Sequence, residues 1–207
     1  MKFIVGIDEV GRGPLAGPVT VCVVSCEEKI YKKLKKNKNL PKFGKDSKKL
    51  KPAEREKYEK VLKILAREGK ISYSINHISN KIIDSKGLSF AIKKAIEKGL
   101  KNLKLENYLK IKNSKLKILL DGGLRAPKEF KNQKTIIKGD EKEKIIAWAS
   151  ILAKVSRDRL MTKLSKKYPH YGFHIHKGYG TEKHQKAIKK HGFSGVHRTS
   201  FLKGFKN

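Results

Sequence analysis

The sequence predicts an α/β domain built around a mixed β-sheet. Two apolar runs near the start, at 2–8 and 19–26, flank a turn at 11–18 that is rich in glycine and proline, as two neighbouring strands would. Farther along, short apolar strands alternate with stretches of helical periodicity. Strands joined by a tight turn, followed by alternating strands and helices, indicate helices packed on a mixed sheet.

Each further element has its own local signal. Pro52 suits the first turn of a helix that Gly69 ends, and the segment 29–51 is expected to be a lysine-rich loop with one short helix. The only seam is at Tyr168-Pro169, after which the chain is loop-like and helix-like and rich in glycine, histidine and aromatic residues. In chain order we expect strands at 2–8, 19–26, 71–75, 117–120 and 135–137, and helices at 52–68, 79–105 and 143–168.

The charge of the chain is strongly positive. It carries 51 Lys+Arg against 19 Asp+Glu, a formal net charge of +32. Some of these lysines are expected only to solvate the surface, but the summed field favours a polyanionic partner such as nucleic acid.

Cysteine usage and hydropathy indicate the compartment. Cys22 and Cys26 share one predicted strand and lie about 13 Å apart at about 3.3 Å per residue, too far for a disulfide. They are expected to be buried free thiols in a reducing compartment. No run of about 18 apolar residues is present, and the first strand begins at Lys2 or Phe3, which leaves no signal peptide. We therefore expect a cytoplasmic protein with no membrane contact.

Three aspartates follow a predicted strand directly or after a short turn. They are Asp8, Asp121 and Asp140, and Glu9 stands next to the first. Because strand ends of an α/β sheet gather at one edge, we expect these four carboxylates to meet in space. Hard cations such as Mg²⁺ and Mn²⁺ take oxygen ligands from carboxylates and substrate phosphates. The sequence thus predicts a metal site for phosphodiester chemistry, where two ions activate a water and stabilise the leaving oxygen.

One geometric objection concerns the adjacent pair. Neighbouring side chains of a strand point to opposite faces, so Asp8 and Glu9 share a site only if the strand ends or bends there. The following Gly11-Arg12-Gly13-Pro14 permits a bend, exposes main-chain groups to a sugar-phosphate, and offers Arg12 to a phosphate. Each acid alone is more simply a cap, a turn former or an ion-pair partner. All four together, in so basic a chain, favour the metal site.

Other polar residues have simpler interpretations. The tail histidines match no common zinc spacing and have no cysteine partner, so hydrogen bonding is the expected role. Asp158, between two arginines in the long helix, is expected to form an ion pair that supports the helix or the site. Trp148 is expected to lie in the core.

Six blocks in register over essentially the whole chain resemble a known family. They are Asp8-Glu9-Val10-Gly11-Arg12-Gly13-Pro14, Asp46-Ser47-Lys48-Lys49-Leu50, Asp121-Gly122, Gly139-Asp140 with Ala149-Ser150-Ile151-Leu152-Ala153-Lys154-Val155, Tyr171-Gly172-Phe173 with His176-Lys177-Gly178-Tyr179-Gly180-Thr181, and His197-Arg198 with Ser200-Phe201. Together they resemble ribonuclease HII, the type 2 ribonuclease H.

The resemblance implies a fold and an activity. The fold is a ribonuclease H-like mixed five-stranded sheet flanked by helices, with a small helical C-terminal region. Residues 1–168 would form the catalytic domain and 169–207 a substrate-binding extension packed on it. The implied activity is a monomeric endonuclease that cuts the RNA strand of RNA–DNA hybrids and nicks 5′ of single ribonucleotides in duplex DNA. It would use Mg²⁺ or Mn²⁺ and leave a 3′-hydroxyl and a 5′-phosphate.

The resemblance also implies roles for individual residues. The metal-binding catalytic carboxylates would be Asp8, Glu9, Asp121 and Asp140. The loop whose backbone senses the ribose 2′-hydroxyl would be Gly11, Arg12 and Gly13. Tyr179 resembles the aromatic that packs on the sugar next to the ribonucleotide, and Lys48 looks like a phosphate contact. Lys51 departs from the family, which often has Ser or Thr there, so the helix starting at Pro52 is expected to lack its N-cap.

A second class of function stays open at this point. Composition alone favours a basic nucleic-acid-binding protein without catalysis, such as a ribosome-associated factor. The four placed carboxylates discriminate between the two classes, because a pure binder gains nothing from acids that face phosphates.

Overall fold

The computed structural model describes residues 2–38, 40, 50–109 and 115–205, and its centre is one mixed five-stranded sheet. The strand order is β3-β2-β1-β4-β5, with β1 antiparallel to β2 and parallel to β4. β3 is antiparallel to β2, and β5 is parallel to β4. The strands are β1 (Lys2–Val10), β2 (Val19–Glu27), β3 (Ser72–Ile78), β4 (Lys115–Asp121) and β5 (Gln133–Ile136).

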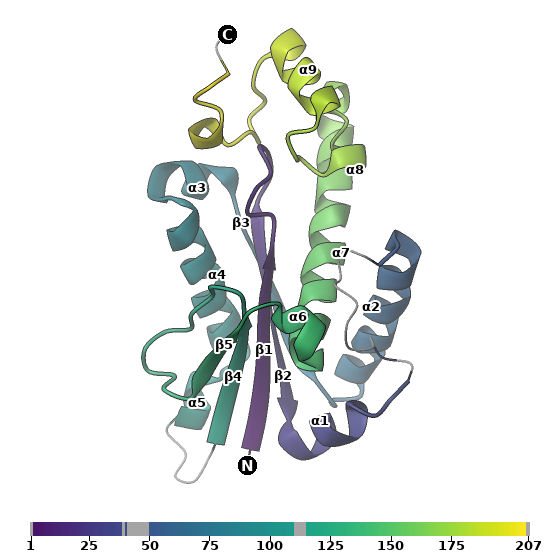
Figure 1. The fold of residues 1–207 in the computed structure, drawn as a ribbon, viewed down its shortest axis with the longest axis vertical. Helices are drawn as coiled ribbons and strands as arrows, with labels where there is room; N and C mark the ends of the chain where they lie inside the picture. Colours follow the sequence, from purple (N-terminus) through teal and green to yellow (C-terminus); the bar gives the residue numbers. More distant parts are fainter. Residues whose placement is uncertain (1, 39, 41–49, 110–114, 206–207) are drawn as a thin grey trace.

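Helices cover both faces of this sheet (Figure 1). One apolar core lies between the sheet and α1, α2 and α7, and the other lies between the sheet and α3 and α4. The helices are α1 (Glu28–Leu34), α2 (Pro52–Arg67), α3 (Asn80–Lys86), α4 (Leu88–Asn102), α5 (Glu106–Leu109), α6 (Gly139–Lys142), α7 (Lys144–Lys167), α8 (Phe173–His176) and α9 (Glu182–His191), with 3₁₀ turns η1 (Pro169–Tyr171) and η2 (Thr199–Phe201).

The central strand β1 is buried from both sides. Val5 and Ile7 belong to the core on the α4 side, and Ile4 belongs to the core on the α7 side. Between them, Gly6 lets α7 approach the strand, because a Cβ at this position would lie well inside 3.0 Å of the Ile145 carbonyl. The sequence of β1 is therefore almost continuously apolar, as in a strand covered on two faces.

The C-terminal segment packs over the turn between β1 and β2. It encloses a small core of Ala16, Met161, Tyr171, Phe173, Ile188 and Leu202. Main-chain hydrogen bonds join the two parts: Leu15 N–H donates to Gly178 O at 2.8 Å, and Arg198 N–H donates to Leu15 O at 2.8 Å. In Figure 1 this segment is the yellow end of the ribbon, beyond the far ends of β1 and α7.

The predicted α/β class and the mixed sheet are confirmed, with differences at element ends. β1 continues two residues past Asp8, so the expectation that it ends there is wrong. The stretch 79–105 is broken by Gly87, whose φ of 85° separates α3 from α4. The last strand was expected at 135–137, but β5 starts at Gln133 because its pairing with Ile118 of β4 determines its place.

The predicted 29–51 loop begins with a helix. α1 starts at Glu28, which is the one short helix expected in this segment. Lys48 lies outside the described residues. The missing N-cap of α2 is offset locally, since the Lys51 N–H donates to the Glu54 carboxylate at 3.0 Å.

Expectations for buried groups are confirmed. Cys22 and Cys26 are buried free thiols, and burial raises the pKa of Cys26 to about 12. Trp148 is fully buried in the core. Within the described ranges, no helix is both long enough and apolar enough to cross a bilayer.

Gly6→Ala should destabilise the fold. The added methyl group would push α7 away from β1, and overpacking of this kind costs about 1–3 kcal/mol. Urea unfolding measures the loss. Gly204→Ala is the matched control, because a Cβ there meets open space, and it should stay within about 0.5 kcal/mol of the wild type. Equal stability of the two variants would contradict this close approach.

Candidate active site

The sheet register places two aspartates side by side. The parallel ladder between β1 and β4 ends at the pair Ile7 and Leu120. Asp8 and Asp121 are the next residues on each strand, so their side chains leave the sheet at the same point. On its other edge β1 stays paired with β2 as far as Val10. The ladder opens only on the β4 side, and the two carboxylates occupy that opening.

Glu9 joins these two aspartates. One carboxylate oxygen from each of Asp8, Glu9 and Asp121 lies within 4.8 Å of the others. Asp8 folds back along the chain, since its Oδ1 accepts the Glu9 N–H at 2.7 Å. The objection about opposite strand faces is thus met by side-chain conformation, while the strand itself continues.

Asp140 lies close by but outside that group of three. It is in the first turn of α6 and only 8% exposed. The preceding Gly139 donates its N–H to Asp121 Oδ1 at 2.6 Å, which ties α6 to the end of β4. A Cβ at Gly139 would collide with Ile146, so glycine permits this approach. The negative charge of Asp140 reaches Asp8 and contributes to raising its pKa.

The acidic cluster is electrostatically strained. Burial, followed by the charges of Glu9 and Asp121, raises the pKa of Asp8 well above its usual range, and a hydrogen bond from Ser150 opposes this. Burial also raises the pKa of Glu9, and Arg12 opposes that rise through a hydrogen bond and its charge. Like-charged groups in so small a volume favour either a bound proton or a bound cation.

The donor set fits a hard divalent cation. Three carboxylate oxygens converge, and oxygen ligands are what Mg²⁺ and Mn²⁺ prefer. Glu9 Oε2 is buried and has no hydrogen-bond partner among the described residues. A buried oxygen left without a partner is costly, and a metal ion would satisfy it.

The glycine-flanked loop follows the cluster directly. Gly11 is buried with φ of 92°, a conformation that favours glycine, whereas Arg12 and Gly13 are exposed. Arg12 Nη1 contacts Glu9 Oε1 at 3.0 Å, so this side chain partly neutralises the cluster. The sequence indicated the Arg12 side chain as a phosphate contact, and the family resemblance indicated its backbone as part of the loop that senses the 2′-hydroxyl. No local pattern indicated the pair with Glu9.

Two further arginines beneath this loop escaped the sequence reasoning. Arg157 of α7 and Arg198 of the tail are both completely buried. An arginine in a basic chain is ordinarily expected on the surface. Arg198 could have been singled out only because it lies in one of the blocks that resemble the family. No local pattern singled out Arg157.

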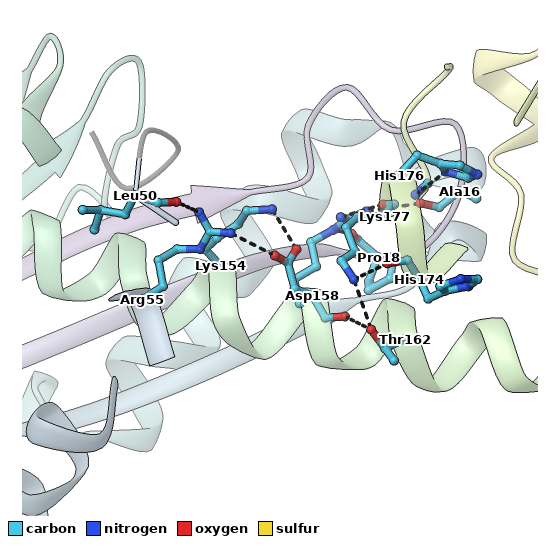
Figure 2. Close-up of polar contacts among 12 residues, drawn as sticks. Ala16, Pro18, Leu50, Arg55, Lys154, Asp158, Thr162, His174, His176 and Lys177 are labelled. Carbon is cyan, nitrogen blue, oxygen red and sulfur yellow. Dashed lines mark hydrogen bonds and ion pairs between the residues drawn. The ribbon is translucent and has the colours of Figure 1, made fainter. Parts of the chain in front are cut away.

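Asp158 forms the expected ion pair, although with other partners than its neighbours in sequence. Its carboxylate contacts Lys154 Nζ at 2.7 Å and Arg55 at 3.8 Å, while Arg55 also donates to the Leu50 carbonyl (Figure 2). This network joins α7 to the start of α2. Lys154 lies about one helical turn past Ser150, the residue of α7 that contacts Asp8.

Tyr179 lies in the tail, 40% exposed. Its N–H donates to the His176 carbonyl at 3.0 Å, and its own carbonyl accepts from His184 Nδ1 at 2.9 Å. The backbone of Tyr179 is therefore held from both sides while its ring stays accessible.

A buried histidine pair supports this carbonyl. Because His184 Nδ1 donates to Tyr179, its Nε2 must accept, and the 3.0 Å contact with His197 Nε2 requires His197 to donate. His197 Nδ1 then accepts the Ser194 N–H at 2.8 Å. Both rings are neutral in this arrangement, and burial lowers the pKa of each to about 4. Within the described part of the chain no histidine belongs to a metal-ligand cluster.

Comparison with known proteins identifies the family. The family model described as Ribonuclease HII matches residues 5–204. The chain belongs to the ribonuclease HII family. The Ribonuclease HII of Clostridium beijerinckii is 43% identical over 201 residues, which cover 97% of this chain and 68% of that protein. The expected resemblance is confirmed.

Solved structures agree with this assignment. The ribonuclease H2 from Pyrococcus horikoshii OT3 matches with a TM-score of 0.67 at 28% identity, covering 96% of this chain and 93% of that one. Bst-RNase HIII, solved in complex with Mn²⁺, shares the fold with a TM-score of 0.59 at 18% identity, covering 92% of this chain and 63% of that one.

Membership of the ribonuclease HII family decides between the two open classes of function. The protein is a hydrolytic nuclease, an endoribonuclease of the ribonuclease H type 2 group that acts on nucleic acid containing RNA. The alternative, a basic binder without catalysis, is wrong. The predicted flanked five-stranded sheet is confirmed by the same comparisons.

The histidine pair predicts a pH dependence of stability. Both imidazoles are less basic in the fold than in the unfolded chain, whose histidine pKa is about 6.5. Their contribution is complete above that pH and is lost as the pH falls through the folded value of about 4.

Histidine NMR measures this directly. The rings of His184 and His197 should stay neutral down to about pH 5 and titrate near 4. Carboxyls also change bulk melting over this pH range, since the pKa of Asp84 is lowered by hydrogen bonds from Ser200 and Thr199 whereas burial raises that of Asp8, so the site-specific signal is the decisive one. Titration of both rings near pH 6.5 would contradict the hydrogen-bonded pair.

Proposed function

We propose that this chain cuts the RNA strand of RNA–DNA hybrids and nicks 5′ of single ribonucleotides in duplex DNA, leaving a 3′-hydroxyl and a 5′-phosphate. The observation that carries the proposal is the acidic cluster of buried Asp8 with half-buried Glu9 and Asp121 in a chain of net charge +32. Surface lysines attract the polyanion without regard to sequence, and the acids, which would repel it, make sense only with bound cations.

The cofactor in this proposal is Mg²⁺ or Mn²⁺, held by Asp8, Glu9, Asp121 and Asp140. Bound ions of this kind would supply an activated water and stabilise the leaving oxygen. The Mn²⁺ complex of Bst-RNase HIII supports the choice, as does the unpartnered Glu9 Oε2. The protein positions these acids through Ser150 at Asp8 and through the Gly139 N–H at Asp121.

Substrate contacts surround the acids. The main chain of Gly11, Arg12 and Gly13 would meet the ribose 2′-hydroxyl, and the exposed ring of Tyr179 would pack on the neighbouring sugar. Lys48 would contact a phosphate. The extension 169–207, with its own small core against the far end of α7, would hold the duplex over the domain formed by 1–168.

Asp121→Asn tests the catalytic proposal. The loss of one ligand charge should reduce Mg²⁺-dependent nicking of a duplex with one ribonucleotide by about three orders of magnitude, roughly 4 kcal/mol. Binding of the duplex should remain near the wild-type level, because the surface cations are untouched. Glu68→Gln, at an exposed carboxylate just after α2, is the control and should cut normally. Unimpaired nicking by Asp121→Asn would refute the assignment.

Tyr179→Ala tests the sugar contact. Loss of an aromatic platform costs about 1–3 kcal/mol, so kcat/KM should fall roughly 5- to 150-fold while Mn²⁺ binding is unchanged. Phe90→Ala removes an aromatic ring of similar exposure from α4, outside the proposed substrate-binding extension, and serves as the control. If both variants cut at wild-type rates, Tyr179 is not part of the site.

A further inference from the structure

Two buried guanidinium groups hold the turn between β1 and β2 by its carbonyl oxygens. Arg198 donates through Nε to Gly17 O at 2.9 Å, through Nη1 to Arg12 O at 2.9 Å and through Nη2 to Gly11 O at 2.7 Å. Every nitrogen of this side chain therefore contacts the main chain of one short loop, and the side chain is completely buried.

Arg157 makes the corresponding contacts from α7. Its Nε donates to Pro18 O at 2.9 Å, Nη1 to Lys177 O at 3.0 Å and Nη2 to Ala16 O at 3.2 Å. In Figure 2, Ala16, Pro18 and Lys177 lie together beside α7. A Cβ at Gly11 would lie inside 3.0 Å of Arg157 Nε, so the glycine leaves room for the guanidinium. The two arginines thus hold both ends of the turn.

Neither guanidinium forms an ion pair with a carboxylate in the described part of the chain. Burying a charge without a counter-charge is expensive, and burial followed by the charge of Arg157 lowers the pKa of Arg198. Arg198 also lies 5.1 Å from the centre of the Phe201 ring.

The carbonyl contacts determine where the neighbouring amides point. In a trans peptide the N–H of one residue is antiparallel to the C=O of the residue before it. Because Gly11 O and Arg12 O both point into Arg198, the N–H groups of Arg12 and Gly13 point the opposite way. Both residues are exposed, and a Cβ on Gly13 would have nothing within 4 Å.

These two N–H groups have no acceptor among the described residues. They are neighbouring donors that face open space, on the residues that follow the acidic cluster, and the Arg12 side chain contacts Glu9. A ligand seated at the acids would place its own oxygen acceptors against them. Between a ribonucleotide and a deoxyribonucleotide, the acceptor that differs is the 2′-hydroxyl.

We propose that Arg198, with Arg157, is a positioning residue that turns the Arg12 and Gly13 amides toward the substrate and thereby sets the preference for ribose over deoxyribose. The inference rests on the proposed function, because it assumes a ribonucleotide at the acidic cluster. Arginine is required in this role: its planar fork reaches three separate carbonyls, whereas the single nitrogen of lysine cannot span them.

Arg198→Lys tests the proposal. Binding is measured in Ca²⁺ in place of Mg²⁺, with a duplex that carries one ribonucleotide and with the all-DNA duplex of the same sequence. The Kd for the all-DNA duplex divided by the Kd for the ribonucleotide duplex should fall by about tenfold or more in the variant, roughly 1.4 kcal/mol. The Kd for the all-DNA duplex itself should change little. Mn²⁺ binding at the acids should be unchanged. Arg67→Lys, at an exposed site on α2, should keep the wild-type ratio.

A second measurement uses the wild-type protein, so that a poorly folded variant does not decide the matter. Hydrogen exchange of the Arg12 and Gly13 amides should be slowed by the ribonucleotide duplex and not by the all-DNA duplex. A folded Arg198→Lys variant with the wild-type Kd ratio, or equal protection by both duplexes, would overturn the inference. A wild-type protein that neither nicks nor prefers the ribonucleotide would instead overturn the proposed function.

Discussion

The strongest constraint on this structure is the repulsion among carboxylates at the open end of the ladder between β1 and β4. Three of their oxygens lie within 4.8 Å of one another, with Asp8 buried and Glu9 and Asp121 half-buried. The strand register leaves them no alternative, because Asp8 and Asp121 are the first residues beyond the last pair. Ser150, Arg12 and the Gly139 N–H each offset part of the repulsion. The repulsion that these groups leave uncompensated favours binding of a cation among the carboxylates.

Helix α7 contacts both the acidic cluster and the turn that follows β1. Its first turn lies against Gly6 of β1, its second turn brings Ser150 to Asp8, and Arg157 reaches the turn after β1. Positions 150 and 157 are about two helical turns apart, so they lie on one side of the helix. A single straight helix thus sets the distance between the acids and the glycine-flanked loop. A larger side chain at position 6 would disturb both at once.

The sequence predicted which carboxylates come together, apart from Asp140 outside the group of three, better than it predicted the boundaries of the elements. Asp8 and Asp121 were identified because a carboxylate directly after an apolar strand is a local signal, and parallel strand ends must gather at one edge. The break at Gly87 and the position of β5 were missed, because the first depends on one positive φ and the second on pairing with a strand distant in sequence.

Long-range side-chain contacts were also beyond the reach of sequence patterns. Asp158 was expected to form an ion pair, yet its partners are Lys154, one turn away, and Arg55 on another helix. The burial of Arg157 and Arg198 gives no periodic signal, because their partners are carbonyl groups that every residue has. Patterns of residue type report apolar faces and charges, and they are silent about which backbone oxygen a side chain will meet.

The positive residues therefore divide into two kinds by what surrounds them. Only seven of the 51 cationic residues are arginine, and two of these seven are completely buried under one loop. Lysines on the surface supply attraction to any phosphate backbone, which positions a duplex but carries no information about its sugars. Discrimination of a hydroxyl needs neutral donors held in one orientation, and water-exposed flexible cations cannot provide that. We propose that the buried arginines do so indirectly, since Arg198 fixes carbonyls on one side of the loop and so leaves the Arg12 and Gly13 amides pointing to the other side.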